Sequence, residues 1–166
     1  MIFGQPFEFA IFYELLEKTD DENWKFGIFL FFIEDEIYPL KGSNYTLSMA
    51  MDYLKDSHQE IIDCQNKNLD ISMTDCLLLE KIAHSHGVRL DNDPENIELP
   101  DSEKIGCFLS PLEVADMGFY LFYYSNDNKN EYLIYSHDYG NTAKRTVLSK
   151  GTVSKVLSQL PSKDKI

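Results

Sequence analysis

The sequence predicts an α+β fold, in which an antiparallel sheet made of an N-terminal meander and a C-terminal hairpin packs with two to four helices. Apolar residues alternate along two segments between Phe7 and Ile33, recur about every 3.6 positions from Leu47, and return in strand-like runs from Phe119. Strands and helices that occur in separate runs favour this class over a doubly wound sheet. At 166 residues, 43% of them hydrophobic, the chain is expected to form a single domain over residues 1–166.

The first strands are predicted in the N-terminal segment. Phe7–Leu15 is aromatic and partly alternating, and Trp24–Ile33 is a stronger strand. In the second strand the even positions, from Trp24 to Phe32, are wholly apolar, whereas the odd positions begin polar and become apolar. We therefore expect a strand whose far half is covered on both faces. Ile37–Tyr38 begins a third strand before Pro39, which completes an antiparallel meander.

Helices are predicted in the middle of the chain. An apolar stripe of helical period begins at Leu47, and Ser43, Asn44 or Thr46 is available to cap it. Ser57–His58 is expected to break this stripe into two helices. A further helix begins after Thr74 as its N-cap and stops near Gly87.

The last third returns to strands and ends in a helix. The predicted elements are a helical turn over Pro111–Asp116, a hairpin of Phe119–Tyr124 and Tyr132–Tyr135, a strand over Arg145–Leu148 and a helix over Thr152–Leu160. Residues 161–166 leave room for a disordered tail.

The charge is strongly acidic and unevenly distributed. Lys and Arg number 15 against 28 Asp and Glu, a formal net charge of −13. Six of the basic residues and one of the acidic residues follow residue 143, so residues 1–143 hold nine basic and 27 acidic residues, a balance of −18. A field of this sign attracts a basic partner and repels phosphate. The competing interpretation is that the acidity serves solubility alone.

Three polar segments concentrate the acidic residues and are the candidate partner-binding sites. Two are predicted turns of the meander, and the third is an acidic loop over residues 91–105 that contains Pro94 and Pro100. For each segment the alternative is an ordinary solvated loop. The candidate partner-binding residues are Asp20, Asp21, Glu22, Glu34, Asp35, Glu36, Asp91, Asp93, Glu95, Glu98, Asp101 and Glu103.

No convincing catalytic or cofactor-binding set is found in the sequence. HExxH, Cys-x-x-Cys, P-loop and Rossmann motifs are absent from it. His84 and His86 would point about 200° apart on a helix, and Cys107 has no nucleophile signature, so structural roles are expected. Asp91–Glu95 has the alternating oxygens of a calcium loop, but Asn96 and Ser102 stand where glycine and glutamate are required. We expect no cofactor and no metal.

Nucleic acid and membranes are not expected as partners. The C-terminal basic residues show no basic–aromatic alternation, and the rest of the chain would repel a phosphate backbone. The most apolar run, Phe26–Ile33, is far shorter than the about 20 residues of a membrane helix. The start lacks a secretory signal pattern, and Cys64, Cys76 and Cys107 are widely spaced and odd in number. A reducing, cytoplasmic location is therefore expected.

A short series of motifs covers about the first 55 residues. Phe9-Ala10-Ile11 is followed by Tyr13-Glu14, then by Trp24-Lys25-Phe26-Gly27 and an aromatic strand. This order resembles the start of bacterial immunity proteins that guard cells against polymorphic or contact-dependent toxins, particularly the immunity protein 42 type. In that family a Phe-Ala-Ile strand precedes Trp-x-x-Gly, an acidic or Asn-Gly turn and a helix.

Trp24, Gly27 and the helix from Leu47 match this pattern, whereas the turn Glu34-Asp35-Glu36 lacks the expected glycine. The resemblance implies a small cytoplasmic protein that binds and blocks a cognate toxin domain without catalytic activity. It supplies no contact residues. We interpret Trp24 as a buried aromatic and Gly27 as a glycine that permits a bulge or close packing.

The leading hypothesis is an immunity protein that neutralises a cognate toxin domain, a basic nuclease-type domain, by electrostatically complementary occlusion. The alternative is an acidic adaptor or regulatory protein-binding domain outside a toxin system. An enzyme with an unrecognised site would require dispersed groups such as His137, Asp138 and Tyr139 to converge in a cleft.

Overall fold

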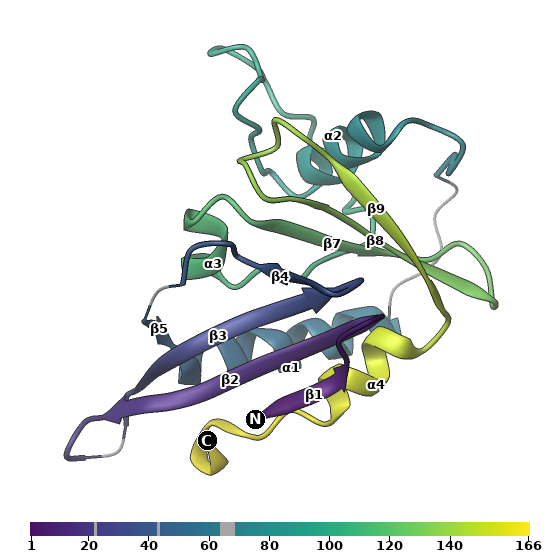
Figure 1. The fold of residues 1–166 in the computed structure, drawn as a ribbon. Coiled ribbons are helices and arrows are strands. Elements are labelled where there is room, and N and C mark those ends of the chain that lie inside the picture. Colours follow the sequence, from purple (N-terminus) through teal and green to yellow (C-terminus); the bar gives the residue numbers. More distant parts are fainter. Residues whose placement is uncertain (22, 43, 64–68) are drawn as a thin grey trace.

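The computed structural model describes residues 1–21, 23–42, 44–63 and 69–166, so Glu22 and Cys64 lie outside the described residues. Within these ranges the chain forms two antiparallel sheets, four α-helices and a 3-10 helix (Figure 1), which confirms the predicted α+β class. The meander and the hairpin belong to two separate sheets.

The N-terminal sheet is built around its central strand, β3. Its described strands are β1 (Ile2–Gln5), β2 (Phe9–Lys18), β3 (Lys25–Ile33), β4 (Glu36–Tyr38) and β5 (Tyr45–Thr46). The order is β1-β2-β3-β4, and β5 pairs with the beginning of β3. The register places Phe12 opposite Leu30, and it shifts between Leu15 and Glu17.

The C-terminal sheet contains the predicted hairpin and its added strand. In sequence and spatial order, its described strands are β6 (Cys107–Phe108), β7 (Tyr120–Tyr124), β8 (Asn130–Ser136) and β9 (Lys144–Ser149).

The helices connect and cover the sheets. In the described ranges they are α1 (Leu47–Asp63), α2 (Asp75–Ser85), α3 (Leu112–Asp116), α4 (Thr152–Ser158) and the 3-10 helix η1 (Lys163–Lys165). The predicted break at Ser57–His58 is wrong. The Ser57 hydroxyl donates to the carbonyl of Tyr53, four residues earlier, at 2.9 Å, so it is satisfied without interrupting α1. The predicted cap of α2 is confirmed, because Thr74 Oγ1 accepts from Leu77 N at 3.4 Å.

The C-terminal segment is tied to the N-terminal sheet. Where the sequence left room for a disordered tail, η1 lies against the beginning of β3, and Lys25 Nζ donates to the carbonyl of Lys163 at 2.6 Å. Lys163 also forms an ion pair with Asp52 of α1 at 3.3 Å. None of the helices in the described part of the chain has the length and apolar content of a membrane span.

The main hydrophobic core lies between the two sheets, α1 and α4. Phe29 and Phe31 of β3 pack in this core with Leu54 of α1 and with Leu121 of the C-terminal sheet. A second cluster, which includes Ile82, joins α2 to the other face of the C-terminal sheet. The C-terminal sheet is therefore covered on both faces, whereas Figure 1 shows α1 behind β2 and β3 and no helix in front of them.

The far half of β3 was predicted to be covered on both faces, but only one face is fully buried. The odd positions, including Gly27, Phe29 and Phe31, are buried, and the even positions from Phe26 to Phe32 are only partly buried. Trp24, interpreted as buried, is 48% exposed just before the strand. Both faces of this strand are largely apolar, so its own pattern could not indicate which face α1 covers. The interpretation of Gly27 is confirmed, because a Cβ there would lie 1.9 Å from Glu14 O.

Candidate partner-binding surface

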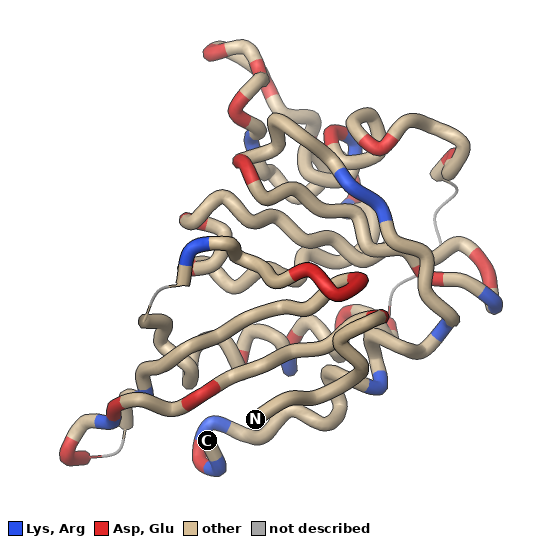
Figure 2. Tube along the Cα trace, viewed as in Figure 1, with Lys and Arg blue, Asp and Glu red and all other residues tan. Residues whose placement is uncertain are grey.

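The three acidic segments lie in three separate places. Asp20 and Asp21 join β2 to β3, and Glu34–Glu36 lies at the other end of the same hairpin. At about 3.3 Å per residue the length of β3 separates these two turns by roughly 30 Å. The loop over 91–105 lies beside α2, beyond the C-terminal sheet, and Figure 2 shows the three acidic segments well apart. The structure therefore does not gather the candidate residues on one patch.

The turn between β2 and β3 uses one of its carboxylates internally. Asp21 accepts hydrogen bonds from the Thr19 hydroxyl at 2.5 Å and from the Asn23 side-chain amide at 2.6 Å. These hydrogen bonds, that from Thr19 first, lower the pKa of Asp21 because they favour its charged form. Asp20 is exposed. Both carboxylates are therefore exposed, but Asp21 is engaged in organising the turn.

The turn between β3 and β4 has no glycine, and acidic residues occupy its two left-handed positions. Glu34 and Asp35 have φ values of 51° and 72°, the left-handed conformation of a two-residue hairpin turn. The turn is held by hydrogen bonds from Glu34 N to Glu8 O at 3.2 Å and from Asp35 N to Pro6 O at 3.0 Å. Both side chains are exposed. The glycine that the resemblance implied is absent, and the neighbouring turn holds Glu34 and Asp35 in this conformation instead.

Two further acidic residues border this turn. Glu36 accepts from Lys144 Nζ at 2.6 Å and from the Tyr38 hydroxyl, and these hydrogen bonds lower its pKa. Glu8, which the sequence interpretation missed, is exposed and lies next to Glu34. Its position after Pro6 was the available signal, because proline often precedes a turn.

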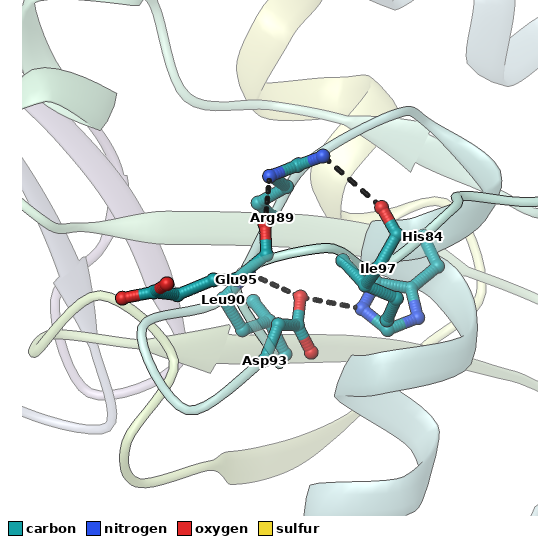
Figure 3. A network of polar contacts seen from close by, with 6 residues as sticks. All are labelled: His84, Arg89, Leu90, Asp93, Glu95 and Ile97. Carbon is teal, nitrogen blue, oxygen red and sulfur yellow. Dashed lines mark hydrogen bonds and ion pairs between the residues drawn. The ribbon is translucent and has the colours of Figure 1, made fainter.

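The acidic loop after α2 is held in one shape by buried polar contacts (Figure 3). Asp93 Oδ2 lies 2.8 Å from His84 Nε2, and both side chains are about nine-tenths buried, with 9% and 10% exposed. The same oxygen accepts from Leu90 N at 2.8 Å. Arg89 donates to the carbonyls of Glu95 and Ile97 at 3.3 and 3.0 Å. Asp93 therefore stabilises the loop from within, as a largely buried hydrogen-bond acceptor, and is not an exposed carboxylate.

The ends of this loop are also fixed, and its remaining acidic residues face outward. Asp91 Oδ2 accepts from Asn141 at 3.0 Å, and His86 Nε2 donates to the carbonyl of Ile105 at 2.9 Å. Of the structural or solvated roles expected for His84 and His86, both have the structural one. Besides Asp91, the exposed carboxylates of the loop are those of Glu95, Glu98, Asp101 and Glu103. A loop ordered before binding loses less conformational entropy when a partner contacts it.

His137, Asp138 and Tyr139, the residues considered for an unrecognised enzyme site, each contact different partners. Asp138 accepts from the Ser136 hydroxyl and from Thr142 N, both at 2.8 Å. The Tyr139 hydroxyl donates to the carbonyl of Asp116, and His137 lies beside the Tyr38 ring. They shape the connection between β8 and β9. Over the described ranges, no group of three or more His, Cys, Asp or Glu is placed to hold a metal ion.

Comparisons with known proteins match almost the whole chain. The family model of immunity protein 42 matches residues 1–163. An uncharacterised protein of Pasteurella multocida (strain Pm70) is 28% identical over 170 residues, which cover 97% of this chain and 99% of that protein. The crystal structure of CdiI from Burkholderia dolosa AUO158 has a similar fold, with a TM-score of 0.73 and 20% identity, over 95% of this chain and 96% of that chain.

Proposed function

Because the chain belongs to the immunity protein 42 family, we propose that it binds and neutralises a cognate toxin domain. The family match over residues 1–163 is the observation that carries this proposal. Neutralisation is by occlusion, without catalysis by this chain, and it takes place in the cytoplasm. The organised acidic turns and loop described above support a protein that works through its surface.

The toxin domain is basic and of the nuclease type. A nuclease needs Lys and Arg to hold phosphate, and a chain with a net charge of −13 offers carboxylates to the same groups. Electrostatic complementarity speeds association and excludes wrong partners, since like charges brought together are costly. The same field repels nucleic acid, so a protein is the partner.

Co-expression tests this function directly. An immunity gene is expected directly downstream of its toxin gene, so the candidate partner is the toxin domain encoded immediately upstream of this chain. That domain is produced in bacteria with and without this chain, and growth and co-purification are measured. We expect arrested growth with the toxin domain alone, and restored growth with a stable complex when both are present. A toxin domain from an unrelated system is the control, because this chain should not relieve its toxicity. Continued arrest together with no co-purification would overturn the proposal.

A further inference from the structure

The outer face of the N-terminal sheet is apolar, although it faces away from the core. On β3 the even positions from Phe26 to Phe32 lie on this side and are partly exposed. The register sets Ile2 beside Phe12, Phe12 beside Leu30, and Ile37 beside Phe32. Ile2 and Ile37 are 47% and 44% exposed. We call this surface the open face; its residues are Ile2, Phe12, Phe26, Ile28, Leu30, Phe32 and Ile37.

Such a face is unusual for a sheet covered on one side. An antiparallel sheet with one solvated face normally carries polar residues on it. With strands about 4.8 Å apart and outward rows about 6.6 Å apart, the seven residues of this face cover roughly 220 Å². This contiguous apolar patch is somewhat smaller than the patches that are often functional in monomers. A stable complex buries about 800 Å² of each partner, so the surroundings of the face must contribute as well.

The charges around the open face are acidic. Glu14 pairs with Ile28 across the strands and is exposed on the same side. Glu8, Glu34 and Asp35 lie exposed at the end of the sheet where β3 turns into β4 (Figure 2). Lys144 at the β4 edge is bonded to Glu36, which compensates its charge. Two copies of this chain would bring like charges together, whereas a partner with Lys and Arg around an apolar centre would be complementary.

A hollow continues the face at its β4 edge. It has a volume of about 390 Å³, and Ile37 and Leu40 line it together with His137. Leu40 is 68% exposed, and His137 Nδ1 is buried without a hydrogen-bond partner among the described residues. A hollow beside an apolar surface can receive an anchoring side chain of a partner, because that side chain loses more of its water there than on a flat surface.

We propose that the open face, with Glu8, Glu14, Glu34 and Asp35 at its rim, is the surface on which the toxin domain docks. The partner presents apolar side chains at its centre and Lys or Arg around them. This inference rests on the proposed function and specifies its interface. It places the contact on the N-terminal sheet rather than on the 91–105 loop.

The test removes apolar surface without changing charge. Ile2→Ser with Ile37→Ser alters two exposed side chains of the open face, so the fold is expected to persist. Leu77→Ser with Val147→Ser is the matched control, since these residues are 48% and 56% exposed on α2 and β9. Binding of the purified upstream toxin domain is measured by calorimetry. We expect the Kd to rise by about tenfold or more for the open-face variant and by less than about threefold for the control.

The outcomes separate the inference from the function on which it rests. If the wild-type chain binds the toxin domain and the open-face variant binds equally well, the docking surface is wrong and the proposed function stands. If the wild-type chain does not bind the toxin domain, both fall. If the free wild-type chain forms a dimer in sedimentation experiments and the open-face variant does not, a second copy covers this face, and the assignment to the toxin is overturned.

Hydroxyl-radical footprinting on the wild-type chain needs no variant. Oxidation of Phe12, Leu30 and Phe32 is followed by mass spectrometry with and without the toxin domain. We expect their oxidation to fall on binding, whereas that of Leu77 and Val147 stays constant. Unchanged oxidation of the three open-face residues in a formed complex would contradict the inference.

Discussion

At Gly27 the backbone of β3 lies too close to its neighbours for any side chain. A Cβ there would lie 1.9 Å from Glu14 O and 2.9 Å from Leu47 Cδ1. Relief of the first contact would disturb the pairing of β2 with β3, so Gly27→Ala should lower the free energy of unfolding by about 3 kcal/mol. Urea unfolding measures this. Gly42→Ala is the control, because nothing lies within 4 Å of its added Cβ, and it should change stability by less than about 1 kcal/mol.

Glu113 joins α3 to β5, just before α1, through one carboxylate. Its oxygens accept from Thr46 N at 2.7 Å and from the Thr46 hydroxyl at 2.8 Å. Glu113→Ala leaves this largely buried amide and hydroxyl without their partner, so we expect a loss of about 2 kcal/mol in urea unfolding. Glu98→Ala removes an exposed carboxylate of the acidic loop and should cost less than about 0.5 kcal/mol. Equal losses would show that the Glu113 contacts contribute little.

Individual carboxylates explain why the candidate site was only partly predictable. The sequence correctly places charge in the two turns and the loop, since these residues lie in polar segments. It could not show that Glu36 is bonded to Lys144, 108 residues later, or that Asp93 lies against His84. The first contact depends on which strands become neighbours, and the second on how the loop folds back onto α2. Exposure of a single acidic residue is therefore a property of the tertiary structure.

At the scale of elements, prediction succeeded where the pattern is long. The two long strands of the meander, α1, α2 and the β7–β8 hairpin each carry enough periodic residues to be recognised. β1, β5 and β6 have four, two and two residues, and their pairing depends on the longer strands beside them. The cover expected on both faces of β3 was wrong for a similar reason: the covering helix, and not the strand, decides which apolar face is buried.

The closure of the acidic loop onto α2 should depend on pH through His86. Burial is the main cause that lowers the pKa of His86 below 6.5. Because its folded-state pKa is depressed, the unfolded chain binds more protons just below pH 6.5. The contribution of neutral His86 to stability is therefore complete above about pH 6.5 and is lost as the pH falls through the lower folded-state value.

Wild type and His86→Gln are compared by urea unfolding between about pH 8 and about pH 5. The wild-type free energy of unfolding should fall more steeply than that of the variant across this range. Subtracting the unfolding free energy of the variant from that of the wild type at each pH cancels the contribution of other groups that titrate in this range. Parallel curves would contradict the assigned role. The hydrogen-exchange protection factors of residues 91–105, which correct for the slower intrinsic exchange at lower pH, should decrease in the same range. Protonation opposes the burial of His86 that accompanies its bond to Ile105.

For the whole molecule, the acidic rim and the apolar open face should affect different rate constants of toxin binding. Long-range charge acts while the partners approach, so it governs the association rate, whereas close contacts formed after docking govern dissociation. Association with the upstream toxin domain should slow by about tenfold or more between about 50 mM and about 500 mM salt, because salt screens exposed charges. An association rate that does not fall with salt would reject electrostatic steering.

Two charge-neutralising variants then locate the effective acidic segment. Glu8→Gln/Glu34→Gln/Asp35→Asn removes three negative charges beside the open face, and Glu95→Gln/Glu98→Gln/Asp101→Asn removes three from the loop beside α2. Both change the net charge of −13 equally, so a difference between them reports location and not total charge. We expect the first variant to have the slower association and the weaker salt dependence in stopped-flow measurements, because its charges border the docking surface.

Ile2→Ser/Ile37→Ser should instead raise the dissociation rate while the association rate stays close to that of the wild type. If the Glu95/Glu98/Asp101 variant slows association more than the Glu8/Glu34/Asp35 variant, the toxin domain docks on α2 and the acidic loop, at the opposite end of the molecule.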